Sequence, residues 1–178
     1  MNLTQNYFEL LGVPQQYHVD KAIVVEHYHK LQKEFHPDKF AAQSENEQRY
    51  AVQFAAYLNT AFQTLTSPVL CAEYLLELVG EETNQQSTTI HDSQFLRLQM
   101  EWRETLSEIA VDTDINRAEE RLDELRDIVS REKKTLQVQF EQQYQNEVYP
   151  EAKQIVAKLH FVDKMLQEIE VLESSLFD

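Results

Sequence analysis

Apolar residues recur along this chain at the three- and four-residue spacing that is typical of amphipathic helices. The first long helix is predicted over residues 21–35, where Asp20 can cap its start. The second is predicted from about Ser44 to Thr66, before Pro68. Their apolar stripes are Val24, Tyr28, Leu31 and Phe35 in the first helix and Tyr50, Phe54, Tyr57, Leu58, Ala61, Phe62 and Leu65 in the second. Two such antiparallel helices joined by a loop, with a short helix closing one end, would form a compact helical unit.

Short helices are expected on either side of this hairpin. One begins at Asn6, which has Glu9 three residues later as in a capping box, and Gly12 can end it. The other runs from about Val69 to Val79, with Gly80 as its C-terminal stop. Residues 81–89 contain no apolar side chain, which is typical of a linker. We therefore expect a first domain over residues 1–76 and a linker over residues 77–90.

Three further helices are predicted in the rest of the chain. They run from about residue 93 to 110, from about 115 to 145, and from near Asn146 and Glu147 to about 176, with Pro150 tolerated in the first turn of the last helix. Their apolar stripes have the period of an antiparallel bundle. The sequence thus predicts an all-α chain, with a helical hairpin and short flanking helices followed by a three-helix bundle over residues 91–178.

Composition agrees with this fold class and argues against binding to nucleic acid. The 178 residues include only 2 Gly and 4 Pro, too few for the many tight turns of an all-β fold. The net charge is −15. Residues 1–76 contain five Lys and Arg and eight Asp and Glu, whereas residues 77–178 contain 11 Lys and Arg and 23 Asp and Glu. Because such a chain repels phosphate backbones, we expect no binding to nucleic acid.

The location expected for the chain follows from what the sequence lacks. No apolar run approaches the roughly 18 residues of a membrane span, and residues 1–6 resemble neither a signal peptide nor a transit segment. Cys71 is the only cysteine, so an internal disulfide or a multi-cysteine metal site is excluded. We expect a cytoplasmic protein without contact to a membrane, and these features leave open whether it is bacterial or a processed mitochondrial form.

The most informative stretch lies between the two helices of the hairpin and reads His36-Pro37-Asp38-Lys39-Phe40. Pro37 has no N–H and disfavours the α region for His36, so the helix stops there and three polar or rigid groups face solvent. An ordinary helix stop with Asp38 as a cap is the alternative, and a three-residue match is weak by itself. The position between two amphipathic helices favours a functional role.

This arrangement, together with Asn59-Thr60-Ala61-Phe62-Gln63-Thr64-Leu65 on the second helix, resembles a J-domain. The resemblance extends along the chain through Tyr7-Phe8, Ala72-Glu73-Tyr74-Leu75-Leu76 and the acidic three-helix unit, all of which are similar to the HscB-type co-chaperones of iron–sulfur cluster assembly. General J-proteins carry a Gly/Phe-rich linker and Cys-rich zinc repeats, which 2 Gly and 1 Cys cannot form.

The resemblance implies a co-chaperone and not an enzyme, with no cofactor and no metal. It would stimulate the ATPase of a dedicated DnaK-type chaperone (HscA-like) and deliver an iron–sulfur scaffold protein (IscU-like) to it. The chaperone-binding residues implied are His36, Pro37, Asp38, Lys30, Lys33 and Lys39. The scaffold-binding residues implied are Leu96, Arg97, Met100, Glu101, Glu104, Glu108 and Phe161. General J-domains have an Arg-Lys pair where this chain has His29-Lys30, which favours a dedicated partner.

Helical spacing supports the scaffold-binding face independently, because Leu96, Met100, Glu104 and Glu108 recur every four residues. One flank would then offer apolar anchors with an acidic rim. The alternative is that Leu96 and Met100 belong to the core of the bundle and that the glutamates only solvate its surface.

Other functions remain open as alternatives. His27, His29 and His36 could suggest a metal site, but their spacing places His27 and His29 on different faces of the helix. A helical adaptor or general J-protein with another client, or a self-associating bundle, would have no role in cluster assembly. An enzyme would need a phosphate-binding loop or a nucleophile with its base, and the sequence shows neither.

Overall fold

The structure is a computed structural model that describes residues 5–82, 90 and 92–176. All regular elements within these residues are helical, which confirms the predicted all-α class. The chain divides into two compact units, the hairpin unit (Met1–Gly80) and the bundle unit (Glu81–Asp178). Of the predicted linker over residues 77–90, residues 83–89 lie outside the described residues.

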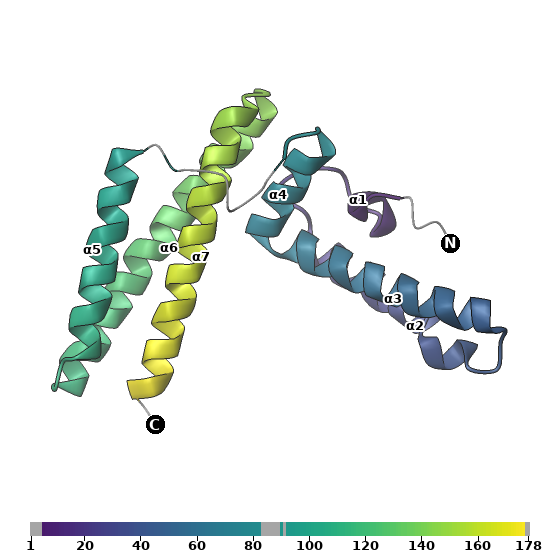
Figure 1. The fold of residues 1–178 in the computed structure, drawn as a ribbon, viewed down its shortest axis with the longest axis horizontal. Helices are drawn as coiled ribbons and strands as arrows, with labels where there is room; N and C mark the ends of the chain where they lie inside the picture. Colours follow the sequence, from purple (N-terminus) through teal and green to yellow (C-terminus); the bar gives the residue numbers. More distant parts are fainter. Residues whose placement is uncertain (1–4, 83–89, 91, 177–178) are drawn as a thin grey trace. The chain divides into compact units, whose positions relative to one another are not determined.

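The hairpin unit contains the helices α1 (Tyr7–Leu10), α2 (Lys21–Glu34), α3 (Glu45–Thr66) and α4 (Pro68–Leu78), with the short 3₁₀ helix η1 (Pro37–Phe40) between α2 and α3. Figure 1 shows α2 and α3 side by side as the antiparallel pair expected from the sequence. α4 extends to Leu78, two residues beyond the expected domain boundary at residue 76. The helix ends just before Gly80, which has a left-handed φ of 86°.

Short-range hydrogen bonds set where these helices begin. The Asn6 side chain accepts from the N–H of Glu9, whose carboxylate accepts from the N–H of Asn6. Ser44 and Glu47 form a second capping box at the start of α3. Such caps satisfy N–H groups that lack a partner within the helix, so the predicted starts of α1 and α3 are confirmed.

The core of the hairpin unit lies around α3. α1, α2 and α4 all pack against this helix, and its residues Phe54, Leu58 and Leu65 are buried. The stripe predicted for α2 is buried only at Val24, whereas Tyr28, Leu31 and Phe35 are half-buried. The C-terminal part of the α2 stripe therefore stays partly open, because α1 and α4 pack on α3.

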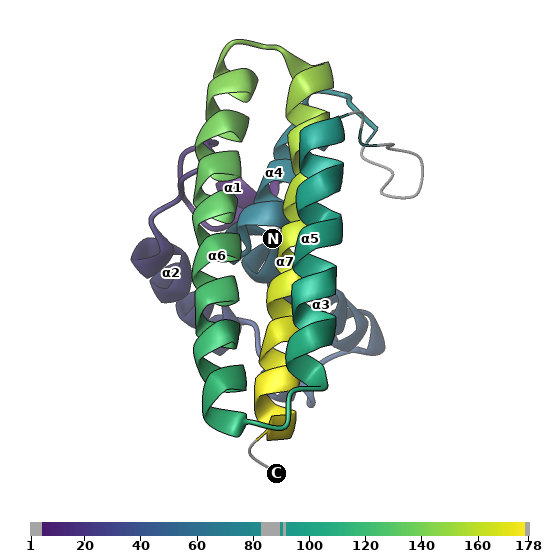
Figure 2. The same cartoon turned by 90° about the vertical axis from the view of Figure 1, so that its left-hand side faces the viewer.

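The bundle unit consists of α5 (Ser93–Ala110), α6 (Ile115–Gln145) and α7 (Tyr149–Leu176). Figures 1 and 2 show these helices lying alongside one another, with the most extensive packing between α6 and α7. The core is formed by buried residues of the predicted stripes: Phe95, Trp102, Ile109, Leu122, Leu125, Val129, Leu136, Phe140, Leu159, Val162, Met165 and Ile169. The predicted three-helix bundle is confirmed.

The turn between α6 and α7 differs from the prediction by a few residues. Asn146 caps the C-terminus of α6, and Glu147 has a φ of 58°, a left-handed conformation that interrupts the helix. α7 therefore starts at Tyr149 and not near Asn146 and Glu147, with Pro150 in its first turn as expected. Among the described helices, none combines the length and the apolarity that crossing a bilayer requires.

Candidate functional site

The His36-Pro37-Asp38 tripeptide lies between the end of α2 and the first turn of η1. α2 ends at Glu34, and His36 has the extended conformation that Pro37 imposes, with φ −60° and ψ 130°. The sequence predicts a loop here, where the helix must stop. Residues 37–40 instead form a 3₁₀ turn, because Pro37 is well suited to the first position of a helix, where no N–H is needed.

His36, and not Asp38, caps this turn. The Nδ1 atom of His36 accepts a hydrogen bond from the N–H of Asp38 at 3.3 Å, and the carbonyl of His36 accepts from the N–H of Lys39 at 3.0 Å. The side chains of His36 and Asp38 are 51% and 89% exposed. The capping role that the alternative assigned to Asp38 is thus taken by its neighbour, and the Asp38 carboxylate is available to another molecule.

Three cationic side chains lie on the two elements that flank His36. Lys30 and Lys33 lie on the last turns of α2, and Lys39 lies on η1; all three are exposed. Within the described part of the chain, none of them forms an ion pair. Their charges therefore extend into solvent beside His36 and Asp38, although the chain as a whole carries a net charge of −15.

The Asn59 and Phe62 side chains of the J-domain-like motif hold α2 against α3 behind the tripeptide. The Tyr28 hydroxyl donates to Asn59 Oδ1 at 2.8 Å, and the Tyr28 ring stacks on Phe62 with 4.2 Å between the ring centroids. This polar and aromatic contact joins the middle of α2 to the C-terminal half of α3. The sequence placed Asn59 in a motif but did not indicate its partner.

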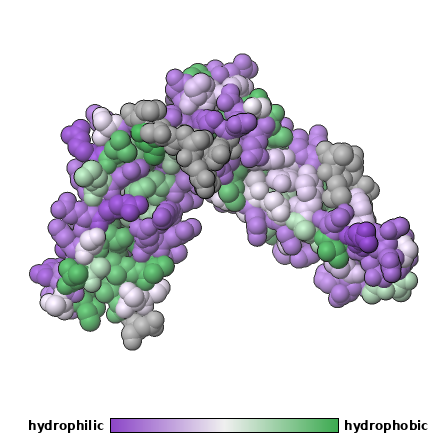
Figure 3. All heavy atoms as spheres, in the orientation of Figure 1, coloured by the Kyte–Doolittle hydropathy of each residue, from purple (hydrophilic) through white to green (hydrophobic). Residues whose placement is uncertain are grey.

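The predicted scaffold-binding residues of α5 lie on the surface of the bundle. Leu96 is 43% exposed and Met100 is 72% exposed, so the alternative that places them in the core is wrong. Arg97, Glu101, Glu104 and Glu108 are also exposed. Figure 3 shows hydrophobic residues among hydrophilic ones on the surface of this bundle.

Phe161 of α7 is half-buried against α5. Its ring stacks on Trp102 at a centroid distance of 6.3 Å and meets Phe95 edge-on at 5.9 Å. The guanidinium carbon of Arg103 lies 5.3 Å from the Phe161 ring centroid. Sequence reasoning missed Arg103, which lies seven residues after Leu96 and therefore on nearly the same side of α5.

The structure does not bring all seven predicted scaffold-binding residues together. At about 100° per residue, Leu96 and Met100 lie on the flank of α5 that also carries Arg103, next to Phe161. Glu101 and Glu108 lie further round the helix, about 140° and 120° from Leu96. The Glu108 carboxylate contacts Arg121 of α6 at 2.6 Å. Residues four apart in a helix differ in direction by about 40°, so a series of four-residue spacings gradually turns round the helix. The regular spacing of Glu108 from Glu104 therefore does not place both on one flank.

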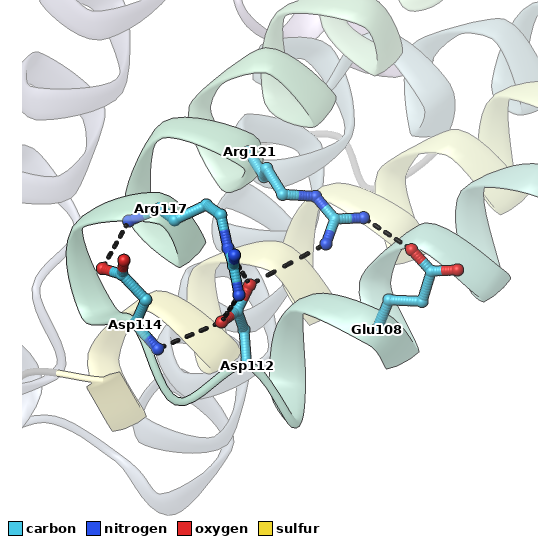
Figure 4. Close-up of polar contacts among 5 residues, drawn as sticks. All are labelled: Glu108, Asp112, Asp114, Arg117 and Arg121. Carbon is cyan, nitrogen blue, oxygen red and sulfur yellow. Dashed lines mark hydrogen bonds and ion pairs between the residues drawn. The ribbon is translucent and has the colours of Figure 1, made fainter.

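Glu108 belongs to a polar cluster at the corner between α5 and α6, drawn in Figure 4. Arg117 donates two hydrogen bonds to the Asp112 carboxylate, at 2.8 and 2.6 Å, and Arg121 lies 4.0 Å from the same carboxylate. The Asp112 side chain is only 4% exposed. These bonds, above all those from Arg117, and a further one from the N–H of Asp114 lower the pKa of Asp112 to about 2.

The histidines of α2 have separate environments. His27 Nδ1 is hydrogen-bonded to the carbonyl of Leu11 at 2.7 Å, whereas His29 is exposed. Among the described residues, no three His, Cys, Asp or Glu side chains are arranged to hold a metal ion.

Residues 91–170 match a family model described as the HSCB C-terminal oligomerisation domain. The chain is 42% identical over 171 residues to the co-chaperone protein HscB homolog of Aliivibrio salmonicida, a match that covers 96% of this chain and 98% of the relative. The chain belongs to the HscB family, the J-type co-chaperones of iron–sulfur cluster assembly. The resemblance stated from the sequence is thereby confirmed.

Solved structures of HscB proteins have the same fold. The chaperone HscB from Vibrio cholerae matches with a TM-score of 0.86 at 37% identity and covers 97% of this chain and 99% of its own. Human co-chaperone protein HscB matches with a TM-score of 0.87 at 26% identity and covers 97% of this chain and 84% of its own. The hairpin unit is the J-domain of this HscB-family chain, and α5–α7 form its C-terminal domain.

Proposed function

We propose that this HscB-family chain stimulates the ATPase of a dedicated DnaK-type chaperone, HscA-like, and delivers to it an IscU-like scaffold protein for iron–sulfur clusters. The J-domain carries the first activity and the bundle the second. The observation that carries the proposal is the exposed His36-Pro37-Asp38 turn, whose Asp38 carboxylate is 89% exposed and is not used as a helix cap. The bacterial relatives support a cytoplasmic location for this exchange.

The charges beside the turn support a chaperone with an acidic docking patch. Lys30, Lys33 and Lys39 are exposed and without ion pairs in the described residues, so they can meet carboxylates of the chaperone. Such complementarity speeds association and fixes the orientation of the complex more than it adds affinity. The rigid turn then presents His36 and Asp38 in one conformation, which lowers the entropic cost of binding. ATP hydrolysis remains the chemistry of the chaperone, and the chain itself is not an enzyme.

The exposed flank of α5 supports docking of the scaffold protein. Leu96 and Met100 offer apolar anchors, and Glu104 lies next to Met100 on the same helix, whereas Glu101 is further round it. An apolar centre with a polar rim is typical of a protein–protein interface. Phe161 adds an aromatic side chain that is held in place by Trp102 and Phe95.

The first experiment measures steady-state ATP turnover of the chaperone with and without the full chain. His36→Gln should abolish the stimulation while helicity and melting temperature stay unchanged, because the side chain is half exposed. The matched control is His18→Gln, at an exposed position before the start of α2, which should stimulate like the wild type. Full stimulation by His36→Gln, or none by the wild type, would contradict the proposal.

The second experiment measures binding of the scaffold protein to the full chain by calorimetry. Met100→Ala should weaken binding about tenfold or more, as expected for an apolar anchor. The control is Val138→Ala on α6, which removes another exposed apolar side chain (63% exposed) and should leave binding unchanged. Equal behaviour of the two variants would contradict the assignment of this flank.

A second candidate role for the bundle is self-association, which the description of the matched family model as an oligomerisation domain favours. Sedimentation velocity of the chain alone decides between the two roles. If Met100→Ala changes the sedimentation of the chain but not its affinity for the scaffold protein, the flank serves a second copy of the chain.

A further inference from the structure

A partly enclosed cavity of about 140 Å³ lies at the loop end of the J-domain hairpin, between α2 and α3. Its floor consists of Leu31 and Phe35 from α2 and of Phe54 and Leu58 from α3. The rings of Phe35 and Phe54 meet edge-on with 4.8 Å between their centroids. Leu31 and Phe35 are two of the three half-buried members of the α2 stripe, so the hairpin leaves part of its own apolar surface uncovered at the cavity.

One end of this cavity is formed by the tripeptide itself. His36 and Pro37 line the cavity next to Phe35. A protein that contacts His36 therefore also lies against the cavity. The tripeptide and the cavity share residues of one surface.

The remaining wall is polar, and hydrogen bonds connect its side chains. Gln32 Nε2 donates to the Tyr28 hydroxyl at 3.1 Å, which in turn donates to Asn59 Oδ1 at 2.8 Å. Gln32 and Asn59 both line the cavity, and each uses one polar atom in this chain of hydrogen bonds. The second polar atom of each amide is left for the backbone of a bound segment.

We propose that this cavity is a docking pocket for one apolar side chain of the partner chaperone, seated when the chaperone contacts His36 and Asp38. This inference rests on the proposed function and adds to it a specific contact outside the tripeptide. An apolar cavity of about 150 Å³ is known to hold benzene, so the volume of 140 Å³ suits one aliphatic or aromatic side chain. Water is a poor occupant of the floor, because four apolar side chains offer it no hydrogen bonds.

The charge around the pocket defines the segment that carries this side chain. Lys33 follows Gln32 at one edge, and Lys39 stands two residues after Pro37 at the other. We expect an apolar residue flanked by carboxylates, whose backbone meets the amides of Gln32 and Asn59. A buried apolar anchor within a polar rim is the arrangement that concentrates binding energy in protein interfaces.

The test fills the pocket from α3 without touching the tripeptide. Ala55 lines the pocket, and its neighbour Ala56 is exposed outside it, so Ala55→Leu and Ala56→Leu add the same atoms at adjacent positions. Ala55→Leu should raise the concentration of co-chaperone that gives half-maximal ATPase stimulation by about tenfold or more. Maximal stimulation should be retained, because His36 and Asp38 are intact. Ala56→Leu should stay within about twofold of the wild type.

Each outcome of this titration has a defined meaning. If Ala55→Leu titrates like Ala56→Leu, the pocket proposal is overturned, while loss of stimulation in His36→Gln keeps the proposed function. If His36→Gln stimulates fully, the proposed function itself fails. If Ala55→Leu changes the sedimentation of the chain alone and not its titration against the chaperone, the occupant is a second copy and the proposal is overturned.

If Ala55→Leu folds poorly, NMR of the unmodified chain tests the proposal instead. The methyl resonances of Leu31 and Leu58, both on the floor of the pocket, should shift when the full chain binds the chaperone. The methyl groups of Leu159, in the core of the bundle, serve as the control and should not shift. Unchanged Leu31 and Leu58 signals in a saturated complex would overturn the proposal.

Discussion

The guanidinium of Arg121 lies 2.6 Å from the carboxylate of Glu108 and thereby joins α6 to the last turns of α5. Arg121 is in turn 4.0 Å from Asp112, so Glu108 is the outer member of a polar cluster at this corner. Its charge is already matched within the bundle. Among the acidic residues expected to bind the scaffold protein, Glu108 therefore has a different environment from Glu104, which has no ion pair in the described part of the chain.

We expect Glu108→Gln to change scaffold binding by less than about twofold, because its carboxylate already has a cationic partner. Glu104→Gln, one turn earlier and exposed, should weaken binding by up to about fivefold, as for other rim charges. Calorimetry at low salt measures both. A larger loss in Glu108→Gln than in Glu104→Gln would show that Glu108 leaves Arg121 to contact the scaffold protein.

Lys33→Ala should weaken the interaction with the chaperone in a manner that depends on salt. At low ionic strength we expect the half-maximal concentration for ATPase stimulation to rise about two- to fivefold. At about 1 M salt, where the Debye length is only about 3 Å, the variant and the wild type should converge. Lys21→Ala, at the opposite end of α2, is the control. A loss that persists at high salt would indicate a packing role for the lysine stem.

Asp112→Asn should destabilise the bundle in a manner that depends on pH. The pKa of Asp112 is about 2 in the folded chain, below its ordinary value of 3.8, so the charged carboxylate stabilises the fold. This contribution is fully present above about pH 4 and is lost as the pH falls toward 2. The variant should melt at a lower temperature than the wild type at pH 7, and the difference should shrink between pH 4 and pH 2.

Thermal unfolding followed by circular dichroism at several pH values checks this expectation. The control is Asp123→Asn, which removes a carboxylate that is 66% exposed and paired with Arg126. We expect a small change at pH 7 for this exposed pair. A difference between Asp112→Asn and the wild type that stays constant down to pH 2 would contradict the assigned pKa.

Gly12→Ala should destabilise the J-domain more than Gly80→Ala. Both glycines have a positive φ, 62° and 86°, which costs an alanine about 1–2 kcal/mol. A Cβ at position 12 would in addition lie 2.9 Å from His27 Nδ1, whereas nothing lies within 4 Å of one at position 80. Urea unfolding should therefore show a free energy of unfolding at least about 1 kcal/mol lower for Gly12→Ala. Equal losses would mean that His27 moves aside freely.

Much of the fold could be predicted from residues close together in the sequence. The caps at Asn6 and Ser44 depend on side chains three residues apart, and the extended conformation of His36 depends on Pro37 alone. The candidate tripeptide and the exposed lysines could be predicted for the same reason. The start of α7 was missed by a few residues, because no local pattern marked Glu147 as left-handed.

The sequence by itself determined which segments are helical and where most of them begin and end, because periodicity, capping and the effect of proline act within a few residues. The family resemblance came from motifs such as His36-Pro37-Asp38, which can be seen in the sequence directly. Only the tertiary structure decided that Leu31 and Phe35 stay half-buried around a cavity, that Arg103 covers Phe161, and that Glu108 is paired with Arg121. These features join residues of different helices. Their physical cause is the way the helices pack, which sets the flank of each helix that is covered and the flank that remains open to a partner.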